Sequence, residues 1–290
     1  MRASPLSPTR PRDEDRPSLP PAGSVGHHRP TLLPDYRRIL GGIFRLRVGF
    51  PAGGNSGAKT EVERIRTVYA ARAKAALAGL YSPFRRGELY MSQRRDEELL
   101  RLLAEHGLTN LAELRILEIG CGRGARLLDF CQWGATPARL HGVDLVEAFV
   151  REGATRLPRS GLLVATADRL PYRDGIFDLV LQFTVFTSIL DRDMRVAAAA
   201  EMRRVTAPGG SIIWYDFRYP SPGNRNVEAL GRGEIRQLFG GWEITVRSLT
   251  LLPPVARRLA PLSFLACRLL ERSLPPLRSH LFALLRKPRS

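Results

Sequence analysis

The segment of the chain that most suggests chemistry is RILEIGCGRGARLL, residues 115–128. A short apolar run passes into a glycine-rich turn, and the turn passes directly into a helical stretch. Glycines let the backbone approach a ligand closely, and the start of a helix offers free N–H groups. The segment therefore predicts a cofactor site around residues 118–124, with a ligand-free strand-to-helix turn as the simpler alternative.

Two kinds of cofactor fit these glycines. Gly120, Gly122 and Ala125 match the tolerant form of the dinucleotide fingerprint, and Asp144 lies at about the expected distance downstream. An acid after the second strand binds ribose hydroxyls in either case, so Asp144 does not decide between the cofactors. Glu118 argues against a dinucleotide, because its charge disfavours a pyrophosphate and suits a cationic amino-acid group.

Three further motifs follow in order. They are ATADRLP at residues 165–171, DGIFDLV at 174–180 and MRRVTAPGG at 202–210. With these, the chain resembles the class I S-adenosylmethionine-dependent methyltransferases, particularly the small-molecule enzymes related to ubiquinone and menaquinone methyltransferases. The resemblance covers residues 115–216. It implies an α/β, doubly wound, Rossmann-like sheet of seven mostly parallel strands whose last strand is antiparallel.

The resemblance also implies roles for residues around S-adenosyl-L-methionine. The glycines approach its methionine part, Glu118 helps to place its amino group, Asp144 binds the ribose, and Asp168 meets the adenine amine. Turn capping by Asp168 and an ordinary polar strand end at Gln182 are the structural alternatives. The residues assigned to the cofactor are Glu118, Gly120, Cys121, Gly122, Gly124, Asp144, Leu145, Ala167, Asp168 and Gln182.

The acceptor is expected to bind beyond the fifth strand, where open parallel sheets place their ligand crevice. The loop WYDFRYPSPGNRN, residues 214–226, carries polar and aromatic groups there. Many relatives have histidines after the fourth strand, whereas this chain has QFTVFTS at residues 182–188 and offers no histidine base there. Asp216 is the predicted base because it lies at the carboxyl end of the fifth strand, and His280 is the second choice. A loop held by proline turns and asparagine hydrogen bonds is the alternative. The predicted acceptor-binding residues are Tyr215, Arg218, Asn224 and Asn226.

The predicted reaction is methyl transfer to a small-molecule, glycan or lipid-linked acceptor, at a hydroxyl oxygen. Direct displacement at the methyl group depends mainly on positioning, and a base assists if the acceptor is a hydroxyl. A weaker resemblance is to methyltransferases encoded among polysaccharide-assembly enzymes. The alternatives are an NAD-dependent oxidoreductase and a non-catalytic basic binding protein with the same fold.

Short apolar runs alternate with helical stretches after residue 115, which is typical of a parallel sheet covered on both faces. The predicted strands cover residues 116–119, 140–143, 162–165, 177–181 and 211–215, then 242–249 and 280–285. The predicted helices between them cover residues 125–133, 146–156 and 192–205, followed by a helical insertion at 253–276.

The amino-terminal part is expected to be organised differently. Residues 1–58 are predicted to be a disordered tail and linker, because they are rich in Pro, Arg, Ser and Gly, with residues 32–50 ambiguous. Residues 59–290 form the predicted methyltransferase domain, with a cofactor-binding core at about 111–216. The acceptor-side elements are expected at 59–110, which includes predicted helices at 60–80 and 92–106, and at 217–280.

The net charge of +17 comes almost entirely from arginine, whose planar fork suits phosphate and carboxylate partners. Nucleic acid is not expected, because no recognition module is visible. The three cysteines have neither disulfide nor zinc spacing, and no metal site is expected. No secretory signal is visible, so a cytoplasmic protein is predicted, with contact to an anionic membrane at its inner face as an additional possibility.

Overall fold

The computed structural model describes residues 56–77, 79, 82–220 and 224–289. The predicted disordered tail, the ambiguous residues 32–50 and the first part of the linker lie outside the described residues. Within the described part, no helix is both long enough and apolar enough to span a bilayer.

Seven strands of the described chain form one sheet in the order β3-β2-β1-β4-β5-β7-β6. The first five pair in parallel, whereas β7 runs antiparallel to both β5 and β6. This confirms the predicted α/β sheet. The strands are β1 (Ile116–Ile119), β2 (Leu140–Asp144), β3 (Gly161–Val164), β4 (Phe177–Phe183), β5 (Thr206–Phe217), β6 (Glu243–Leu251) and β7 (Arg278–Arg286).

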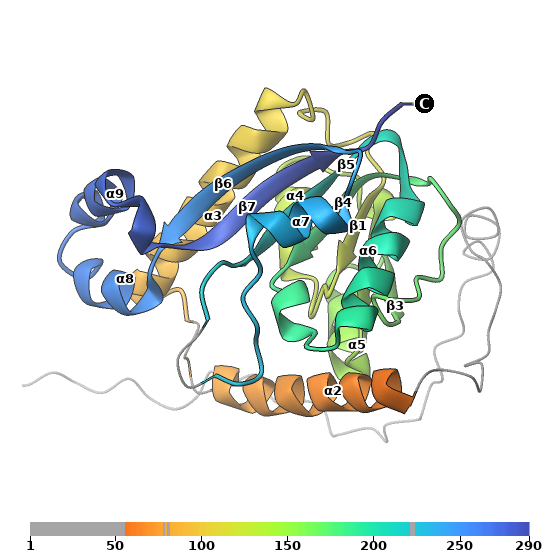
Figure 1. Ribbon diagram of the computed structural model, residues 1–290, viewed down its shortest axis with the longest axis horizontal. Coiled ribbons are helices and arrows are strands. Elements are labelled where there is room, and N and C mark those ends of the chain that lie inside the picture. The colour runs from red at the N-terminus through yellow and green to blue at the C-terminus, as the bar shows by residue number, and fades with distance from the viewer. Residues whose placement is uncertain (1–55, 78, 80–81, 221–223, 290) are drawn as a thin grey trace, which may run out of the picture. The chain divides into compact units, whose positions relative to one another are not determined.

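Helices cover both faces of this sheet (Figure 1). The α-helices are α2 (Ser56–Leu77), α3 (Arg86–Glu105), α4 (Ala125–Gln132), α5 (Glu147–Arg156), α6 (Arg192–Val205), α7 (Arg232–Leu238), α8 (Pro253–Leu259) and α9 (Phe264–Ser273). Helices α6 and α7 pack on one face, and α3 and α4 pack on the other.

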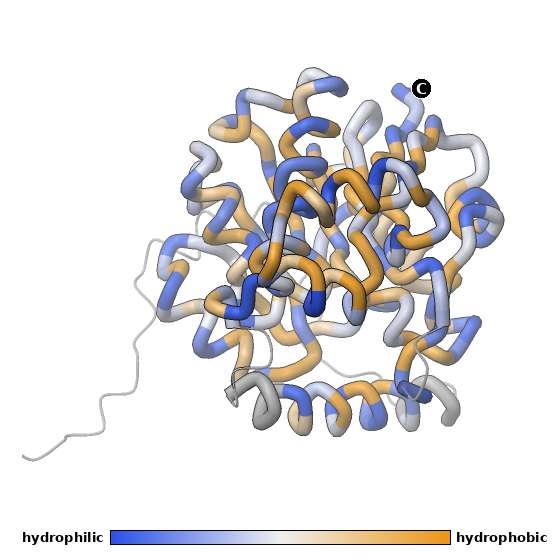
Figure 2. The backbone as a smooth tube through the Cα atoms, turned by 90° about the vertical axis from the view of Figure 1, so that its left-hand side faces the viewer, coloured by the Kyte–Doolittle hydropathy of each residue, from blue (hydrophilic) through white to orange (hydrophobic). Residues whose placement is uncertain are grey.

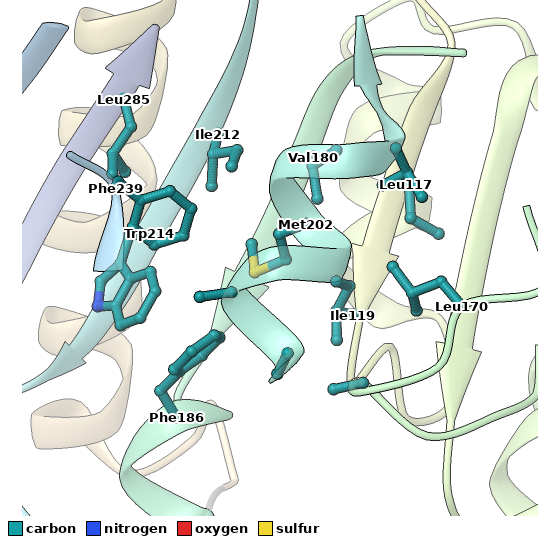
Figure 3. Packing of buried hydrophobic residues seen from close by; sticks show 14 of the residues in the cluster. Leu117, Ile119, Leu170, Val180, Phe186, Met202, Ile212, Trp214, Phe239 and Leu285 are labelled. Carbon is teal, nitrogen blue, oxygen red and sulfur yellow. The ribbon is translucent and has the colours of Figure 1, made fainter. Parts of the chain in front are cut away.

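Alternation along each strand divides the core between these faces. On β1, Leu117 and Ile119 belong to the cluster under α6, whereas Ile116 belongs to the cluster under α3 and α4. Figure 3 shows the first cluster, in which Trp214 of β5 lies near Phe239 after α7. Because both faces are buried, the parallel strands are almost continuously apolar, and this explains why the pattern predicted them correctly.

Three helix boundaries differ from the prediction. Helix α2 begins at Ser56 instead of Thr60, so residues 56–58 belong to a helix and not to a linker. Helix α3 begins at Arg86 instead of Ser92. The predicted start was wrong because the residue before the helix makes no side-chain capping hydrogen bond that could have marked it. The predicted helical segment 253–276 is divided into α8 and α9 around Pro261, and the Ser263 hydroxyl caps the second helix.

Candidate active site

The glycine-rich turn joins β1 to α4. Gly120, Gly122 and Gly124 all have left-handed backbone conformations, with φ of 70°, 53° and 73°. Only glycine adopts this region without strain. A Cβ atom on Gly120 would also lie 2.6 Å from Cγ2 of Val185, so the turn and the loop after β4 meet without room for a side chain.

Asp144, the last residue of β2, connects this turn to the next loop. Its Oδ2 accepts a hydrogen bond from the backbone N–H of Gly122 at 2.8 Å, and its Oδ1 accepts one from that of Val146 at 2.8 Å. Each carboxylate oxygen retains a lone pair for a further donor. Burial raises the pKa of Asp144, and backbone hydrogen bonds oppose this effect.

A cavity of about 190 Å³ lies beside Asp144 at the carboxyl ends of the central strands. Helix α2 contributes to it and runs across this end of the sheet (Figure 1). Hydroxyl groups and one carboxylate provide its polar chemistry. The residues that line it are Ile65, Tyr69, Ile119, Gly120, Val143, Asp144, Leu145, Val146, Ala165, Ala167, Phe183, Thr184, Val185, Ser188, Ile189 and Met194.

Hydrogen bonds hold α2 against the segment after β4, beside the cavity. The hydroxyls of Tyr69 and Ser188 lie 2.9 Å apart, and Nη2 of Arg64 donates to the Ser188 carbonyl at 2.6 Å. Glu61 accepts a hydrogen bond from the backbone N–H of Leu190 at 2.5 Å. Its hydrogen bond from Arg64 lowers the pKa of the Glu61 carboxyl. Helix α2 is therefore a wall of the site that is held by the loop after β4.

That loop contains a strained residue at the cavity. Thr184 has a positive φ of 57°, which is unfavourable for a β-branched side chain. Its backbone N–H donates to the Tyr215 carbonyl at 2.7 Å, and this bond holds the conformation. Such strain is typical of functional sites, because the surrounding structure must over-determine the conformation.

Two carboxylate oxygens near the glycine turn and the loop after β3 have no hydrogen-bond partner among the described residues. They are Oε2 of Glu118 and Oδ1 of Asp168, and both atoms are buried. Burial raises the pKa of Glu118 to about 8, although the nearby Arg126 opposes this. A buried acceptor without a donor is costly, so both positions fit a ligand that carries N–H groups.

Asp216 does not occupy the position expected of a base. Its side chain is only 1% exposed. Oδ2 accepts from Nε2 of Gln182 at 2.9 Å, and Oδ1 accepts from the hydroxyl of Thr187 at 2.6 Å. Burial raises the pKa of Asp216 to about 7. Because a base must reach the proton that it removes, this arrangement favours a positioning role for Asp216, and the predicted base stays a prediction.

Gln182 belongs to the same buried network and does not line the cavity. Its Oε1 accepts from the backbone N–H of Val185 at 3.1 Å, while its amide donates to Asp216. Val185 is the residue that approaches Gly120 most closely. The network therefore connects β5 to the glycine turn through the loop after β4.

Tyr215, predicted to bind the acceptor, and His280, the second choice for the base, are core residues. Their rings stack with centroids 4.4 Å apart, and the Tyr215 hydroxyl lies 2.9 Å from Oγ1 of Thr250. Burial lowers the pKa of His280 to about 3, so its imidazole is neutral at physiological pH. Neither side chain lines the cavity, because alternation along β5 directs Tyr215 to the opposite face from Trp214.

The remaining predicted acceptor residues also lie away from the cavity lining. Nη1 of Arg218 lies 3.4 Å from the Pro275 carbonyl, and its guanidinium lies over the Tyr219 ring. Oδ1 of Asn224 accepts from the backbone N–H of Asn226 at 3.2 Å. This turn is the structural alternative that the sequence had left open for the two asparagines.

Four of the predicted cofactor residues thus line the cavity: Gly120, Asp144, Leu145 and Ala167. None of the next five lines the cavity: Glu118 lies in β1, Cys121, Gly122 and Gly124 lie in the glycine turn, and Asp168 lies in the loop after β3. Tyr69 and Ser188, which line the cavity, were not predicted from the sequence. A hydroxyl on the apolar face of the first amphipathic helix was the available signal for Tyr69.

Residues 117–214 match a family model described as a methyltransferase domain. The chain is 32% identical over 107 residues to the ubiquinone/menaquinone biosynthesis C-methyltransferase UbiE of Burkholderia cenocepacia, covering 36% of this chain and 43% of that protein. It is 32% identical over 106 residues to the demethylmenaquinone methyltransferase of Beutenbergia cavernae, covering 37% and 42% of the two chains. The chain thus spans less than half the length of these relatives.

A solved structure with a similar fold belongs to a Galdieria sulphuraria protein proposed to be a sarcosine dimethylglycine methyltransferase. The two chains superpose with a TM-score of 0.51 at 16% sequence identity. The similarity covers 69% of this chain and 86% of that chain. At this identity the likeness shows the fold.

Proposed function

Because residues 117–214 form a class I S-adenosylmethionine-dependent methyltransferase domain, we propose that the chain transfers a methyl group from this cofactor to a small-molecule acceptor. The observation that carries the proposal is the position of Asp144. Its carboxylate lies at the cavity, beside the glycine turn, with lone pairs available to a ligand.

The chain's residues fit the parts of the cofactor. Asp144 would accept hydrogen bonds from the ribose hydroxyls, and Asp168 would use its unpartnered oxygen for the adenine amine. Glu118 would attract the cationic amino group, which would also lower the pKa of this carboxyl by favouring its charged form. The turn with Gly120 and Gly122 would leave room for the methionine backbone.

The bound cofactor supplies an electrophilic methyl group on a positively charged sulfur. The chain's contribution is to position the acceptor and to exclude water, through α2 on one side and the loop after β4 on the other. The hydroxyls of Tyr69 and Ser188 are the groups that could orient a polar acceptor. Burial raises the pKa of Tyr69, so its phenol acts as a hydrogen-bonding group and not as a base at neutral pH.

The finer proposal concerns the atom that receives the methyl group. The first candidate is the one predicted from the sequence, a hydroxyl oxygen on a small molecule, a glycan or a lipid-linked intermediate. A carbon acceptor is the second candidate, and the name C-methyltransferase of the UbiE relatives favours it. Incubation with labelled cofactor and pooled metabolites, followed by mass spectrometry and NMR of the product, distinguishes an O-methyl from a C-methyl product.

Calorimetry tests the proposal directly. The protein should bind S-adenosylmethionine or S-adenosylhomocysteine, and not NAD, because the unpartnered oxygen of Glu118 suits an N–H group, which a pyrophosphate lacks. Asp144→Ala should weaken this binding by about 10- to 100-fold, since two hydroxyls lose a charged partner.

Asp193→Ala is the matched control, because it removes an exposed acid in the first turn of α6 whose side chain does not line the cavity. The control should bind the cofactor as the unaltered protein does. Binding of NAD alone, or equal affinity of the Asp144 and Asp193 variants, would contradict the proposed cofactor site.

A further inference from the structure

Helices α8 and α9 carry an unusual number of exposed leucines. They lie where the long β6–β7 ribbon ends (Figure 1), and in Figure 2 this side faces the viewer, with hydrophobic and hydrophilic residues intermixed. Leu262, Leu265, Leu269 and Leu274 are 80%, 66%, 56% and 47% exposed. Single exposed leucines are ordinary, but a contiguous group marks an interaction surface.

Two of these exposed leucines, Leu269 and Leu274, line an apolar hollow. An open depression of about 560 Å³ lies between the two helices. Its lining contains a single hydroxyl-bearing residue and is otherwise aliphatic. The lining residues are Leu259, Ala266, Leu269, Leu270, Ser273 and Leu274.

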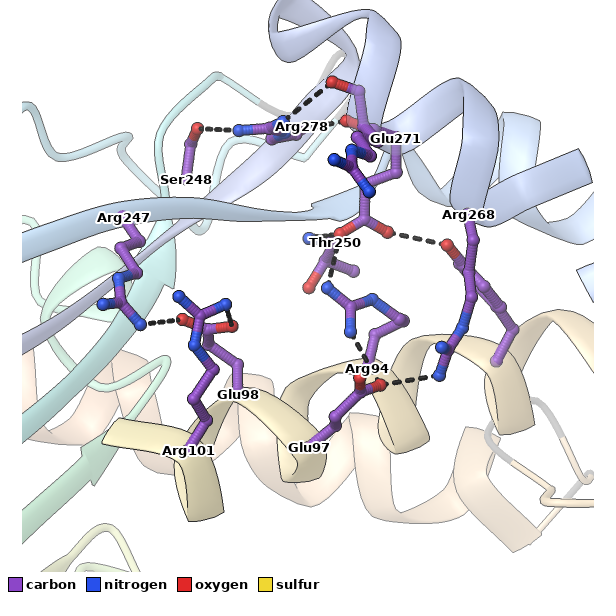
Figure 4. Close-up of polar contacts among 12 residues, drawn as sticks. Arg94, Glu97, Glu98, Arg101, Arg247, Ser248, Thr250, Arg268, Glu271 and Arg278 are labelled. Atoms are coloured by element: carbon purple, nitrogen blue, oxygen red, sulfur yellow. Dashed lines mark hydrogen bonds and ion pairs between the residues drawn. The ribbon is translucent and has the colours of Figure 1, made fainter. Parts of the chain in front are cut away.

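These leucines are exposed although their helices are firmly held. The buried Glu271 of α9 accepts a hydrogen bond from the hydroxyl of Tyr90 at 2.7 Å and one from the backbone N–H of Thr250 at 3.3 Å. Figure 4 shows the ion pairs between Arg94 and Glu271 and between Arg268 and Glu97. The leucines therefore project from a fixed part of the fold, residues 253–274, which we call the platform.

The arginines of the platform fall into two groups. Arg257 and Arg268 point toward α3, where they pair with Glu88 and Glu97 at 2.7 Å each. Arg258 and Arg272 are exposed and have no ion pair among the described residues. Arg257 and Arg268 are therefore engaged in ion pairs within the fold. The one acid of the platform, Glu271, is buried, so its outer surface carries only positive charge.

The apolar and basic groups share one side of α9. Leu265, Leu269 and Arg272 follow each other at intervals of four and three residues, which places them on the same helix face. Cys267 and Glu271 occupy the buried face. A leucine stripe beside arginines is the composition of a helix that lies in the interface of an anionic bilayer.

We propose that the outer face of α8 and α9 docks on an anionic phospholipid membrane. Leu262, Leu265 and Leu269 enter the boundary between headgroups and acyl chains, while Arg258 and Arg272 bind lipid phosphates. An anionic bilayer is the partner that fits a surface on which leucines project beside unpaired arginines and no acid is exposed. This docking surface goes beyond methyl transfer and does not depend on it.

Co-sedimentation with vesicles tests the proposal. The full chain should bind vesicles of phosphatidylglycerol mixed with phosphatidylcholine, and binding should weaken with salt. Arg258→Gln with Arg272→Gln should reduce the binding by about tenfold or more, because each arginine near an anionic surface contributes about 1 kcal/mol. Leu265→Ser with Leu269→Ser should also reduce it, and should do so at high salt as well, since the lost contribution is apolar.

Matched controls remove the same chemistry elsewhere. Arg232→Gln with Arg236→Gln takes two exposed arginines from α7, and Leu100→Ser takes an exposed leucine from α3. Both controls should bind vesicles as the unaltered chain does, and thermal melting verifies that every variant folds. The proposal is overturned if the chain ignores these vesicles, or if the controls lose as much binding as the platform variants. It is also overturned if the chain dimerises and the leucine variant is monomeric, since a second copy would then cover the face.

Discussion

At the scale of single residues, the carboxyl groups divide by the partners that the fold provides. Asp144 has lone pairs that remain available at the cavity, whereas both carboxylate oxygens of Asp216 accept hydrogen bonds from the side chains of Gln182 and Thr187. Two acids at the carboxyl ends of strands therefore have different roles. The first suits a ligand, and the second supports the loop that carries Val185 to the glycine turn.

Burial of Asp216 predicts a pH dependence of stability. Its pKa is raised to about 7 in the folded chain, against roughly 3.9 when unfolded. The folded state then holds a proton that the unfolded state releases, so the stabilisation is complete below about pH 4 and is lost as the pH rises through 7. Between pH 5 and 7 the free energy of unfolding should fall by about 2 kcal/mol from this group.

Urea unfolding of Asp216→Asn at pH 5 and pH 8 checks this expectation. The variant should lose less stability over this interval than the unaltered chain, whatever its stability at either pH, because it has no proton to release there. Glu118, whose pKa is raised to about 8, contributes the same slope to both proteins. An identical slope in the two proteins would show that Asp216 does not titrate there, and Asp193→Asn serves as the control.

At the scale of elements, the backbones of α3 and α8 pack so closely that no side chain fits between them at Gly87. A Cβ atom on Gly87 of α3 would lie 2.7 Å from Cα of Arg257. Beside this contact, Arg257 pairs with Glu88. The close approach is what joins the C-terminal helices to the rest of the domain at this point.

Gly87→Ala should therefore lower the free energy of unfolding by about 1–3 kcal/mol, since two backbones must move apart. Gly233→Ala in α7 is the matched control, because a Cβ atom there meets nothing within 4 Å. The control should be neutral or slightly stabilising, as alanine favours a helix over glycine. Chemical denaturation measures both variants, and equal effects would refute the close packing at Gly87.

At the scale of the described domain, α2 and the loop after β4 enclose the cavity together. The contacts of Tyr69 and Arg64 with Ser188 connect the two segments. A ligand in the cavity touches both, so its binding energy should stabilise them jointly.

Hydrogen exchange with S-adenosylhomocysteine measures this coupling. Amide exchange should slow in α2 around residues 65–69 and in residues 184–189, whereas exchange in α9 should stay unchanged, because α9 does not line the cavity. Protection of the glycine turn without any change in α2 would show that α2 is not a wall of the ligand site.

Local patterns in the sequence were sufficient to predict most of the sheet and the turn at the candidate cofactor site. The glycine turn, the acid at the end of β2, the buried strands and α6 all depend on residues close together in the chain. They were predicted to within a few residues, except that β5 begins at Thr206, five residues before its predicted start. The start of α3 was misplaced because no capping side chain marks it.

Tertiary structure alone decided what each polar group contacts. Asp216 is buried by Gln182 and Thr187, which are distant in sequence, and His280 stacks on Tyr215 across the antiparallel pair of β5 and β7. Periodicity could not separate the leucines of α9 that pack from those that project, since both follow the helical repeat. The reason is physical: a residue's type and spacing set its local conformation, whereas its burial and partners depend on segments that only folding brings together.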